Sequence, residues 1–594
     1  MKSKKNIILF SALFAGLLIF PNCSDDLLEE HPDTFLTADQ LYNTQSGFES
    51  GLNGLYALVR NEREGQGYTN GFGETGLRAL MNIGGTDIYN SGAGAGGEFS
   101  AIYEDWARAN VPTDKSLEKA FNWLYQTVLA ANLLIDRAEN PDVKWDDDAT
   151  KDLYVAEARL VRAWAYRHLT YMWGKVPLVL NEVTGDNFRT DYVREDIHII
   201  RRQIINDLLF AESRMDWFPS QMGRATKGVV LNYLAEMYLA EAGKIEGSYN
   251  TTMLDSAFMY ANKCIEEGPY SLIRERMGSG PGNAFMDMFN PANTNMETGN
   301  TEALWVLLWE KNVTGGGANL MRFSFRPKYD KAGSIGPDIA ISYYDESRGG
   351  RGFARTALTK WALYLFNLSS DYENQVIDDR GSEYAIAKYY ILGKYDTFSG
   401  NKSLSGEPWQ EGDTVWIGCP NIDQCDDRTQ GTINGFENLE SGASEGDSNN
   451  WPYTLKYNFC DVGYPKNNAS HFDQVYVRLA ETYLLRAEAA MKLDNIPQVT
   501  SDINELRTRA HALTVSDSDI SLSLILEERA RELMAEEQRR YTLLRTMPGP
   551  EVIDWISSRN GRDQNIALRD TLFPIPQSVI DANVSLVMEQ NPGF

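Results

Sequence analysis

Helical periodicity occupies two separate blocks of this chain, and it restricts the fold more than any other feature. From about residue 38 to 267, and again from about 475 to 594, apolar residues recur at i, i+3, i+4 and i+7. This is the pattern of amphipathic helices and predicts a mostly α-helical protein. The expected helices cover residues 41–59, 117–138, 152–173, 197–211, 225–242, 254–265, 476–493, 499–512 and 523–546.

The expected helices follow one another with short connections, and they combine alanine with large aromatic residues. Ala235 and Ala240 lie close to Tyr233 and Tyr238 in the sequence. Small residues let paired helices approach closely, as in α-solenoid repeats. No strict repeat of about 34 residues is visible, but we expect tetratricopeptide-like helix pairs.

Residues 268–474 interrupt the helical pattern and are dense in Gly, Pro, Asn, Asp and Ser. Short β-prone runs occur there, notably at 303–309, and a smaller stretch of the same kind covers 65–111. We therefore expect one domain over 38–594, in which a helical scaffold (38–267 and 475–594) carries a loop-rich insertion with short strands. Loops on a rigid scaffold often carry binding residues.

Residues 1–22 have the layout of a secretion signal, with three lysines followed by an apolar stretch at 7–20. Cys23 comes next and resembles the cysteine of a bacterial lipobox, although residues 20–22 are not the usual small ones. The acidic residues that follow resemble the surface-export signal of Bacteroidetes lipoproteins. We expect a signal peptide over 1–22, lipidation of Cys23, a tether over 23–37, and a place on the cell outer membrane. The alternative is an ordinary signal peptide with an incidental cysteine.

The charge balance excludes some partners. The chain has 56 basic and 83 acidic residues, a net charge of −27 and a pI of about 4.7. Nucleic acids and anionic lipid surfaces are bound through positive surfaces, so neither is an expected partner. The only long apolar stretch is N-terminal, so no membrane-spanning helix is expected in the mature chain.

Residues that are typical of enzyme sites are not grouped in this sequence. The five histidines are scattered, and HExxH, zinc-spaced Cys/His and GxSxG patterns are absent. Residues 92–97 fit GxGxxG but lack the strand and helix of a dinucleotide site. The acidic group at 423–427 lacks EF-hand spacing and is interpreted as a solvated turn. We expect no cofactor, no metal and no catalysis. Because 83 acidic residues are present, a carboxylate pair for glycoside hydrolysis stays open.

Four cysteines follow Cys23. Secretion permits disulfides, and Cys419 and Cys425 bracket a short loop-like stretch, so a bond between them is plausible on spacing. Cys460 could pair with either of them, and spacing does not choose. Cys264 lies on a helical pattern and is expected to pack as a small apolar residue.

A series of motifs runs in order along nearly the whole chain. They are Glu157–Tyr166, Trp173–Leu178 (WGKVPL), Arg224–Thr226, Arg478–Glu488, Ile503–Arg507, Glu528–Leu533, Pro574–Pro576 and Gln590–Gly593. Behind a lipoprotein-type signal, these motifs resemble the SusD/RagB family, the surface glycan-binding lipoproteins of Bacteroidetes.

The resemblance implies a non-catalytic protein that captures oligosaccharide or polysaccharide and passes it to a SusC-like TonB-dependent transporter. Some relatives handle peptides, so a peptide- or protein-binding lipoprotein is a second alternative beside the glycoside hydrolase. Charges at helical spacing are usually structural. We therefore expect ion pairs between helices for the charged motif residues Glu157, Arg162, Glu481, Arg486, Glu488, Arg529 and Glu532.

Sugar binding combines flat aromatic rings, which stack on apolar C–H faces, with polar side chains that bond to hydroxyls. The stretch 84–106 offers this mix where the resemblance places ligand contacts, and the insertion offers it again. The candidate ligand residues are Asp87, Tyr89, Asn90, Tyr103, Trp106, Arg322, Tyr343 and Tyr344. Trp123, Trp305 and Trp361 are expected in the core.

Overall fold

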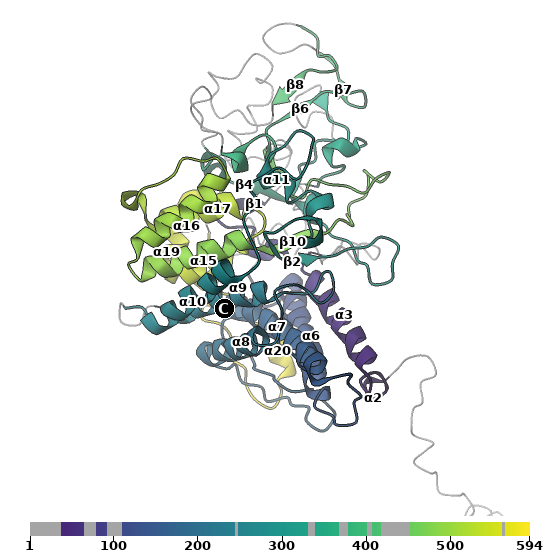
Figure 1. Ribbon diagram of the computed structural model, residues 1–594, viewed down its shortest axis with the longest axis vertical. Coiled ribbons are helices and arrows are strands. Elements are labelled where there is room, and N and C mark those ends of the chain that lie inside the picture. Colours follow the sequence, from purple (N-terminus) through teal and green to yellow (C-terminus); the bar gives the residue numbers. More distant parts are fainter. Residues whose placement is uncertain are drawn as a thin grey trace, which may run out of the picture.

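A helical scaffold forms one end of the molecule, and the loop-rich insertion forms the other (Figure 1). The structure is a computed structural model that describes residues 37–63, 79–91, 110–243, 248–330, 339–353, 355–366, 378–400, 407–416, 452–560 and 565–594. Its elements are mostly helices with a few very short strands, so the predicted fold class is confirmed.

The first helical block is a row of antiparallel helices. Its members are α2 (Ala38–Leu41), α3 (Gln45–Arg60), α6 (Lys115–Arg137), α7 (Asp148–Trp173), α8 (Ile197–Glu212), α9 (Lys227–Glu241) and α10 (Thr251–Glu267). From α6 onward each helix packs on the next. Asp114 and Asp147 cap α6 and α7 by accepting hydrogen bonds from first-turn N–H groups. Because α7 lies between α6 and α8, it is buried on nearly all sides from Val155 onward.

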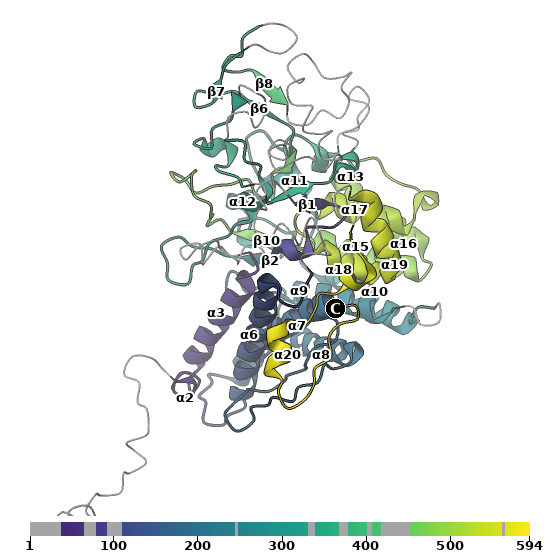
Figure 2. The same ribbon diagram turned by 180° about the vertical axis from the view of Figure 1, so that it is seen from behind.

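The second block completes the scaffold. It contains α15 (Leu479–Lys492), α16 (Ile496–Arg509), α17 (Leu522–Glu532), α18 (Arg539–Thr546), α19 (Gly549–Arg559) and α20 (Gln577–Ala582), with 3₁₀ turns η11 (Asp517–Asp519) and η12 (Leu568–Thr571). Helix α15 packs on α9 and α10, which joins the two blocks. The chain then returns to the first block, where α20 lies beside α6 (Figure 2) and Gln577 N donates to Pro112 O at 2.8 Å.

Two predicted helices were wrong in their extent. The helix expected over 476–493 begins only at Leu479, because Gln474–Arg478 form strand β10. The helix expected over 523–546 is two helices, α17 and α18. Between them Ala535 has φ 65°, a left-handed conformation that cannot continue a right-handed helix. Helix α19 was not predicted.

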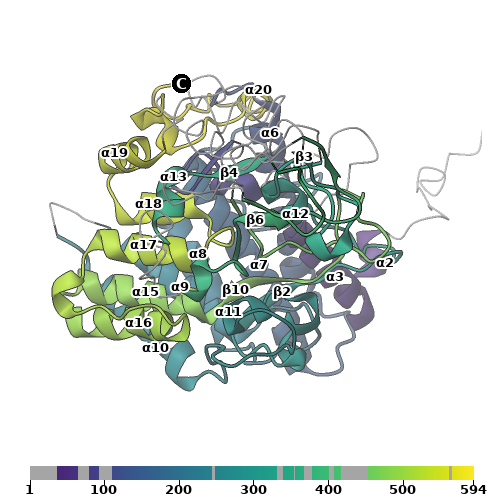
Figure 3. The ribbon, with the colours of Figure 1, turned by 90° about the horizontal axis from the view of Figure 1, so that it is seen from above.

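In the part of the chain that the structure describes, five pairs of short antiparallel strands hold the insertion. They are β1 (Tyr89–Ser91) with β4 (Thr356–Leu358), β2 (Ala303–Leu307) with β10, β3 (Ile339–Ala340) with β7 (Thr397–Phe398), β5 (Ile386–Ala387) with β9 (Tyr453–Thr454), and β6 (Tyr389–Ile391) with β8 (Thr414–Trp416). The β-prone run at 303–309 is thus confirmed over 303–307. Short helices complete it: α11 (Ala284–Asp287), α12 (Met321–Phe325), α13 (Lys360–Tyr364), and η4 to η8 (79–82, 291–293, 296–298, 346–348 and 379–381). Seen from above, strands β2 and β10 at the base of the insertion lie over α7 (Figure 3).

The charged family motifs are structural, as predicted. Arg162 pairs with Asp207 at 2.8 Å, Glu157 with Arg224 at 3.1 Å, and Glu488 with Arg545 at 2.7 Å. Trp123, Trp305 and Cys264 are at most 5% exposed, as expected, and burial raises the pKa of the Cys264 thiol to about 12. Trp361 is only partly buried against the core.

One buried charge cluster joins the second helical block to the insertion. The Glu532 cluster consists of four cations and four anions that are at most 5% exposed: Arg380, Lys456, Arg478, Arg509, Glu302, Glu528, Glu532 and Glu536. Glu532 lies 2.5 Å from Arg478 and 3.1 Å from Arg380, and it also bonds to Arg509. These arginines hold the pKa of Glu532 below its usual range, against the effect of burial.

Replacement of Glu532 by Gln should therefore destabilise the fold strongly. Removing one partner leaves buried arginines uncompensated, which typically costs about 3–5 kcal/mol. We expect a loss of this size in urea unfolding at pH 7, while the exposed Glu411→Gln changes little. Because the folded-state pKa is depressed, the stabilisation by Glu532 exists above the unfolded Glu pKa of about 4.3 and is lost as the pH falls below it. The difference between wild type and variant should shrink in acid. Equal stability at pH 7 would contradict this account.

Candidate functional site

Three of the predicted ligand residues are buried structural groups. Asp87 is 0% exposed, and its carboxylate accepts from Arg539 at 2.6 and 2.9 Å and from Trp555 Nε1 at 2.7 Å. Tyr89 and Asn90 are each 2% exposed, and the Tyr89 ring packs on Phe325 at 5.1 Å. A ligand on the surface cannot reach these side chains, so their assignment as contacts is corrected: Asp87 ties its loop to α18 and α19.

Other predicted residues lie outside the described residues. These are Tyr103, Trp106, the lipidation site Cys23, and the cysteines Cys419 and Cys425. Their assignments stay predictions. Of the remaining cysteines, Cys460 is a buried free thiol, and the two loop cysteines with which it could pair lie outside the described residues.

Arg322 is also buried, at 2% exposure, but it organises the surface above it. Its guanidinium donates to Asn468 O at 3.1 Å, and to the carbonyls of Asn467 and Arg351. Burial and the neighbouring Arg326 lower its pKa to about 10, so it stays charged at neutral pH. Arg322 was predicted to contact the ligand, and this assignment is corrected: it clamps two loops, 342–351 and 459–470, to each other.

The two loops approach each other so closely that only glycine fits at their junction. Gly349 has φ 78° and Gly350 has φ 74°, both left-handed. A Cβ at Gly349 would lie 2.2 Å from Asn458 O, and one at Gly350 would lie 2.6 Å from Pro465 O. Arg351 N donates to Pro465 O at 2.8 Å. The loops thus form one tightly joined unit.

This unit presents tyrosine rings to solvent. Tyr343 and Tyr344 stack on each other, with ring centroids 4.7 Å apart and planes 20° apart. Tyr344 is 48% exposed, and Tyr464 on the second loop is 50% exposed. Gly463 N donates to Glu346, which fixes Tyr464 beside the first loop. Of the two predicted tyrosines, Tyr344 therefore lies at an accessible surface, and Tyr343 is partly buried against a core cluster of the insertion.

Cations accompany these rings. Lys466 Nζ lies 3.9 Å from the Tyr344 ring centroid, Lys311 Nζ lies 3.1 Å from that of Tyr464, and the Arg351 guanidinium lies 5.9 Å from that of Tyr343. Lys466 lowers the pKa of the Tyr344 hydroxyl. We call this group the tyrosine surface; it consists of Lys311, Tyr343, Tyr344, Arg351, Tyr464 and Lys466.

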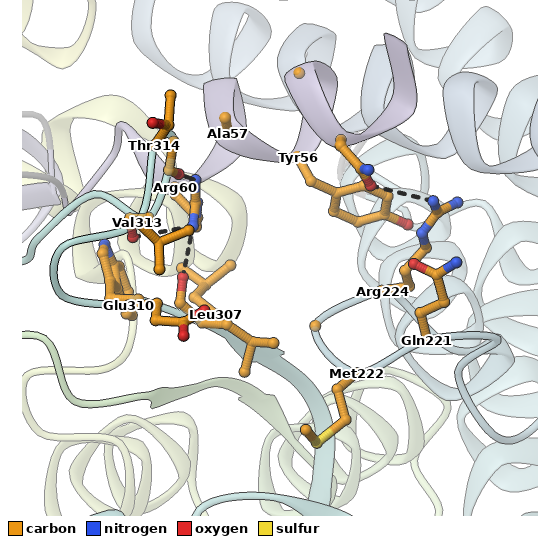
Figure 4. A pocket seen from close by; sticks show the side chains of 17 residues that line it. Tyr56, Ala57, Arg60, Gln221, Met222, Arg224, Leu307, Glu310, Val313 and Thr314 are labelled. Atoms are coloured by element: carbon orange, nitrogen blue, oxygen red, sulfur yellow. Dashed lines mark hydrogen bonds between the residues drawn. The ribbon is translucent and has the colours of Figure 1, made fainter. Parts of the chain in front are cut away.

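A pocket of about 450 Å³ adjoins the loop that carries Lys311. Figure 4 shows Arg60 on one side of it and Arg224 on the other. Arg60 donates to Leu308 O at 2.8 Å and to Gly316 O at 3.3 Å, so it holds the base of this loop. Arg224 and Tyr56 both bond to Glu157. These two arginines and Tyr56 are thus hydrogen-bonded within the protein, and Arg60 positions the loop.

The exposed rings and cations of the tyrosine surface are groups that can contact a ligand. Asp461 accepts from His471 Nδ1 at 2.6 Å and lies 3.8 Å from Lys311, so this acid orients the lysine. Within the described ranges, no group of three or more His, Cys, Asp or Glu side chains could hold a metal ion. Of the helices that the structure describes, none is long and apolar enough to cross a membrane.

Comparison with known proteins decides the family. The model of the SusD family matches residues 301–594, and a second model, described as "Starch-binding associating with outer membrane", matches residues 28–239. The chain belongs to the SusD family. The resemblance of the sequence motifs is thereby confirmed.

Other SusD-family proteins match nearly the whole chain. SusD-like protein P25 of Formosa agariphila is 24% identical over 588 residues, which cover 95% of this chain and 94% of that protein. A SusD homolog from Bacteroides thetaiotaomicron shares the fold with a TM-score of 0.67 at 18% identity, covering 94% and 99% of the two chains. A laminarin-binding SusD-like protein does so with a TM-score of 0.61 at 18% identity, covering 92% and 99%.

Four of the six residues of the tyrosine surface were not predicted from the sequence of this SusD-family protein. Lys311, Tyr464 and Lys466 were not candidates, and neither was Arg351. The sequence did indicate that Tyr464 is a candidate ligand contact, because it lies between Gly463 and Pro465 in the loop-rich insertion. The same criterion that selected Tyr343 and Tyr344, an aromatic residue in a turn-rich segment, applies to it.

The clamp can be tested by Arg322→Met. The variant keeps much of the side-chain length but removes the donors to three loop carbonyls, and each carbonyl left unsatisfied typically costs about 1–3 kcal/mol. We expect faster amide hydrogen exchange and proteolysis in 342–351 and 459–470 with the helical scaffold unchanged. Arg274→Met, at an exposed arginine paired with Glu505, is the control. Unchanged exchange in both loops would show that Arg322 does not hold them.

Proposed function

We propose that this SusD-family protein is a non-catalytic cell-surface lipoprotein that binds glycan and delivers oligosaccharide to a SusC-like TonB-dependent transporter. One observation carries the binding role: the stacked Tyr343–Tyr344 pair, with Tyr344 about half exposed at 48%, on loops fixed by a buried arginine. An exposed ring in a fixed place is what a sugar's C–H face requires.

The tyrosine surface suits weak, reversible capture. Its rings are already oriented by Arg322, Gly349 and Gly350, so little side-chain and loop entropy is lost on binding. Tyr343 stacks on Tyr344 and Lys466 lies over the Tyr344 ring, so a sugar must share this ring with groups of the protein, which limits the affinity. Modest affinity is an advantage in a protein that must release its ligand to a transporter.

The related proteins support the choice of glycan. One neighbour is a laminarin-binding protein, and the family model over residues 28–239 is described as starch-binding. The transporter partner rests on the family resemblance, and the lipid anchor rests on the signal-like residues 1–22 and Cys23. The same model's description, which associates its members with the outer membrane, supports a location there, and surface exposure is part of the proposal.

Two other functions make different predictions. A glycoside hydrolase would release reducing ends from a polysaccharide during prolonged incubation. A peptide- or protein-binding lipoprotein would bind no glycan, and Tyr344 would be indifferent to its ligand. The absence of both reducing-sugar release and peptide binding, together with glycan binding, is the outcome that the proposal requires.

Tyr344→Ala should weaken glycan binding by several-fold to about tenfold, since it removes one stacking face and unstacks Tyr343. The measurement is isothermal titration of the mature protein with a panel of oligosaccharides, starting with those of laminarin and starch. Tyr384→Ala is the matched control, because Tyr384 is also an exposed tyrosine, at 38%, but lies outside the tyrosine surface. Equal effects of the two substitutions would exclude this surface as the binding site.

A further inference from the structure

The cations of the tyrosine surface stand out in a chain with a net charge of −27. An ammonium group lies over each of its two most exposed rings, Lys466 at 3.9 Å from the Tyr344 centroid and Lys311 at 3.1 Å from the Tyr464 centroid. The feature is repeated on an adjacent loop, where Lys394 lies 5.7 Å from the centroid of Tyr395, which is 63% exposed. That loop is joined to the tyrosine surface through Arg348, which bonds to Asp396 at 2.7 Å.

Of the nearby carboxylates, Asp461 pairs with Lys311 at 3.8 Å, and all three accept hydrogen bonds from within the protein. Glu346 accepts from Gly463 N, Asp345 accepts from Ser347 N at 3.0 Å and Oγ at 2.6 Å, and Asp461 accepts from His471 N at 3.0 Å and Nδ1 at 2.6 Å. Among the residues that the structure describes, Lys466 and Lys394 have no carboxylate within ion-pair distance. Their charges are therefore available to a ligand.

The position of Lys466 discriminates between neutral and acidic sugars. A sugar that stacks on Tyr344 must displace the ammonium from the ring, which forfeits a cation–π interaction. With a neutral sugar, the displaced ammonium can form hydrogen bonds only to hydroxyl groups. With a sugar that carries a carboxylate or sulfate, the ammonium forms a charge-assisted hydrogen bond to that group, which is roughly twice as strong as a neutral hydrogen bond.

We infer that the tyrosine surface takes an acidic glycan, whose rings stack on Tyr344 and Tyr464 while its carboxylate or sulfate groups pair with Lys466 and Lys311. This inference rests on the proposed function and narrows its substrate class. A polymer with an anionic group on successive residues would engage several tyrosine–lysine pairs at once.

Salt dependence alone does not test the inference. The net charge of −27 repels an anionic glycan at long range, while the lysines attract it locally, and salt screens both interactions. Substitution of one lysine separates the two, because it changes the local attraction far more than the distant repulsion.

The test compares wild type with Lys466→Met, Lys466→Arg and Lys175→Met in titrations of the mature protein. The probes are oligogalacturonate, a sulfated galactan oligosaccharide and neutral laminarin oligosaccharide. Lys175 is exposed, pairs with Asp196 at 3.2 Å, and lies on the scaffold, so Lys175→Met matches the charge change away from the surface.

We expect at least one acidic probe to bind about tenfold or more tightly than the neutral one. Lys466→Met should remove most of this preference without weakening neutral binding, whereas Lys466→Arg and Lys175→Met should retain it. Which acidic probe binds tells carboxylate from sulfate recognition.

Neutral binding that equals or exceeds binding of both acidic probes would overturn the inference but leave the proposed function intact. The same holds if Lys466→Met weakens acidic and neutral binding equally. Failure of every probe to bind would overturn the proposed function together with the inference.

Discussion

The shared carboxylate of Glu532 is the interaction on which the arrangement of this protein depends. Burial of eight charges is tolerable only where each is paired, because an isolated ion loses several kcal/mol of hydration on leaving water. The pairs of the Glu532 cluster connect β10, α16 and α17 with Arg380 and Lys456 of the insertion. The base of the insertion therefore has one permitted position on the scaffold, since a shift would leave charges buried and unpaired.

Above this base, hydrogen bonds from buried arginines hold the loops of the insertion in place, a role that a large sheet has in other folds. Within the described residues, the strands of the insertion pair two by two and are two to five residues long, so ladder hydrogen bonds fix little of the backbone there. Arg322 and Arg60 supply donors to the carbonyls of separate loops instead. The planar guanidinium carries five donors in a fixed geometry and stays charged when buried, which makes it suited to holding several loop segments at once.

Local sequence patterns predicted most helices well. They failed where the structure of a segment depends on residues that are distant in the sequence. Helices α6, α7 and α8 were predicted within a few residues because their apolar spacing and caps are local. Tyr476 and Val477 were predicted to begin a helix, but they lie in β10, and the partner strand β2 lies some 170 residues earlier in the chain. Asp87 is a polar residue in a glycine-rich stretch, which predicts exposure. Its partners Arg539 and Trp555 are more than 450 residues away, and no periodicity could identify them.

The candidate site was also predictable only in part, because some of its features are local in the sequence and others depend on distant residues. Tyr343 and Tyr344 follow from composition, but the fact that Lys466 covers Tyr344 follows from the junction of two loops at Gly349 and Gly350.

The junction of the two loops also determines how the tyrosine surface would bind a ligand. An ion pair at an exposed position contributes only about 0–1 kcal/mol, and one stacked ring contributes a similar amount, so a single sugar is held weakly. Several tyrosine–lysine pairs on joined loops raise the affinity for a chain of sugars, because each contact after the first is intramolecular. Selectivity for a polymer and easy release of its short fragments then arise from the same weak contacts.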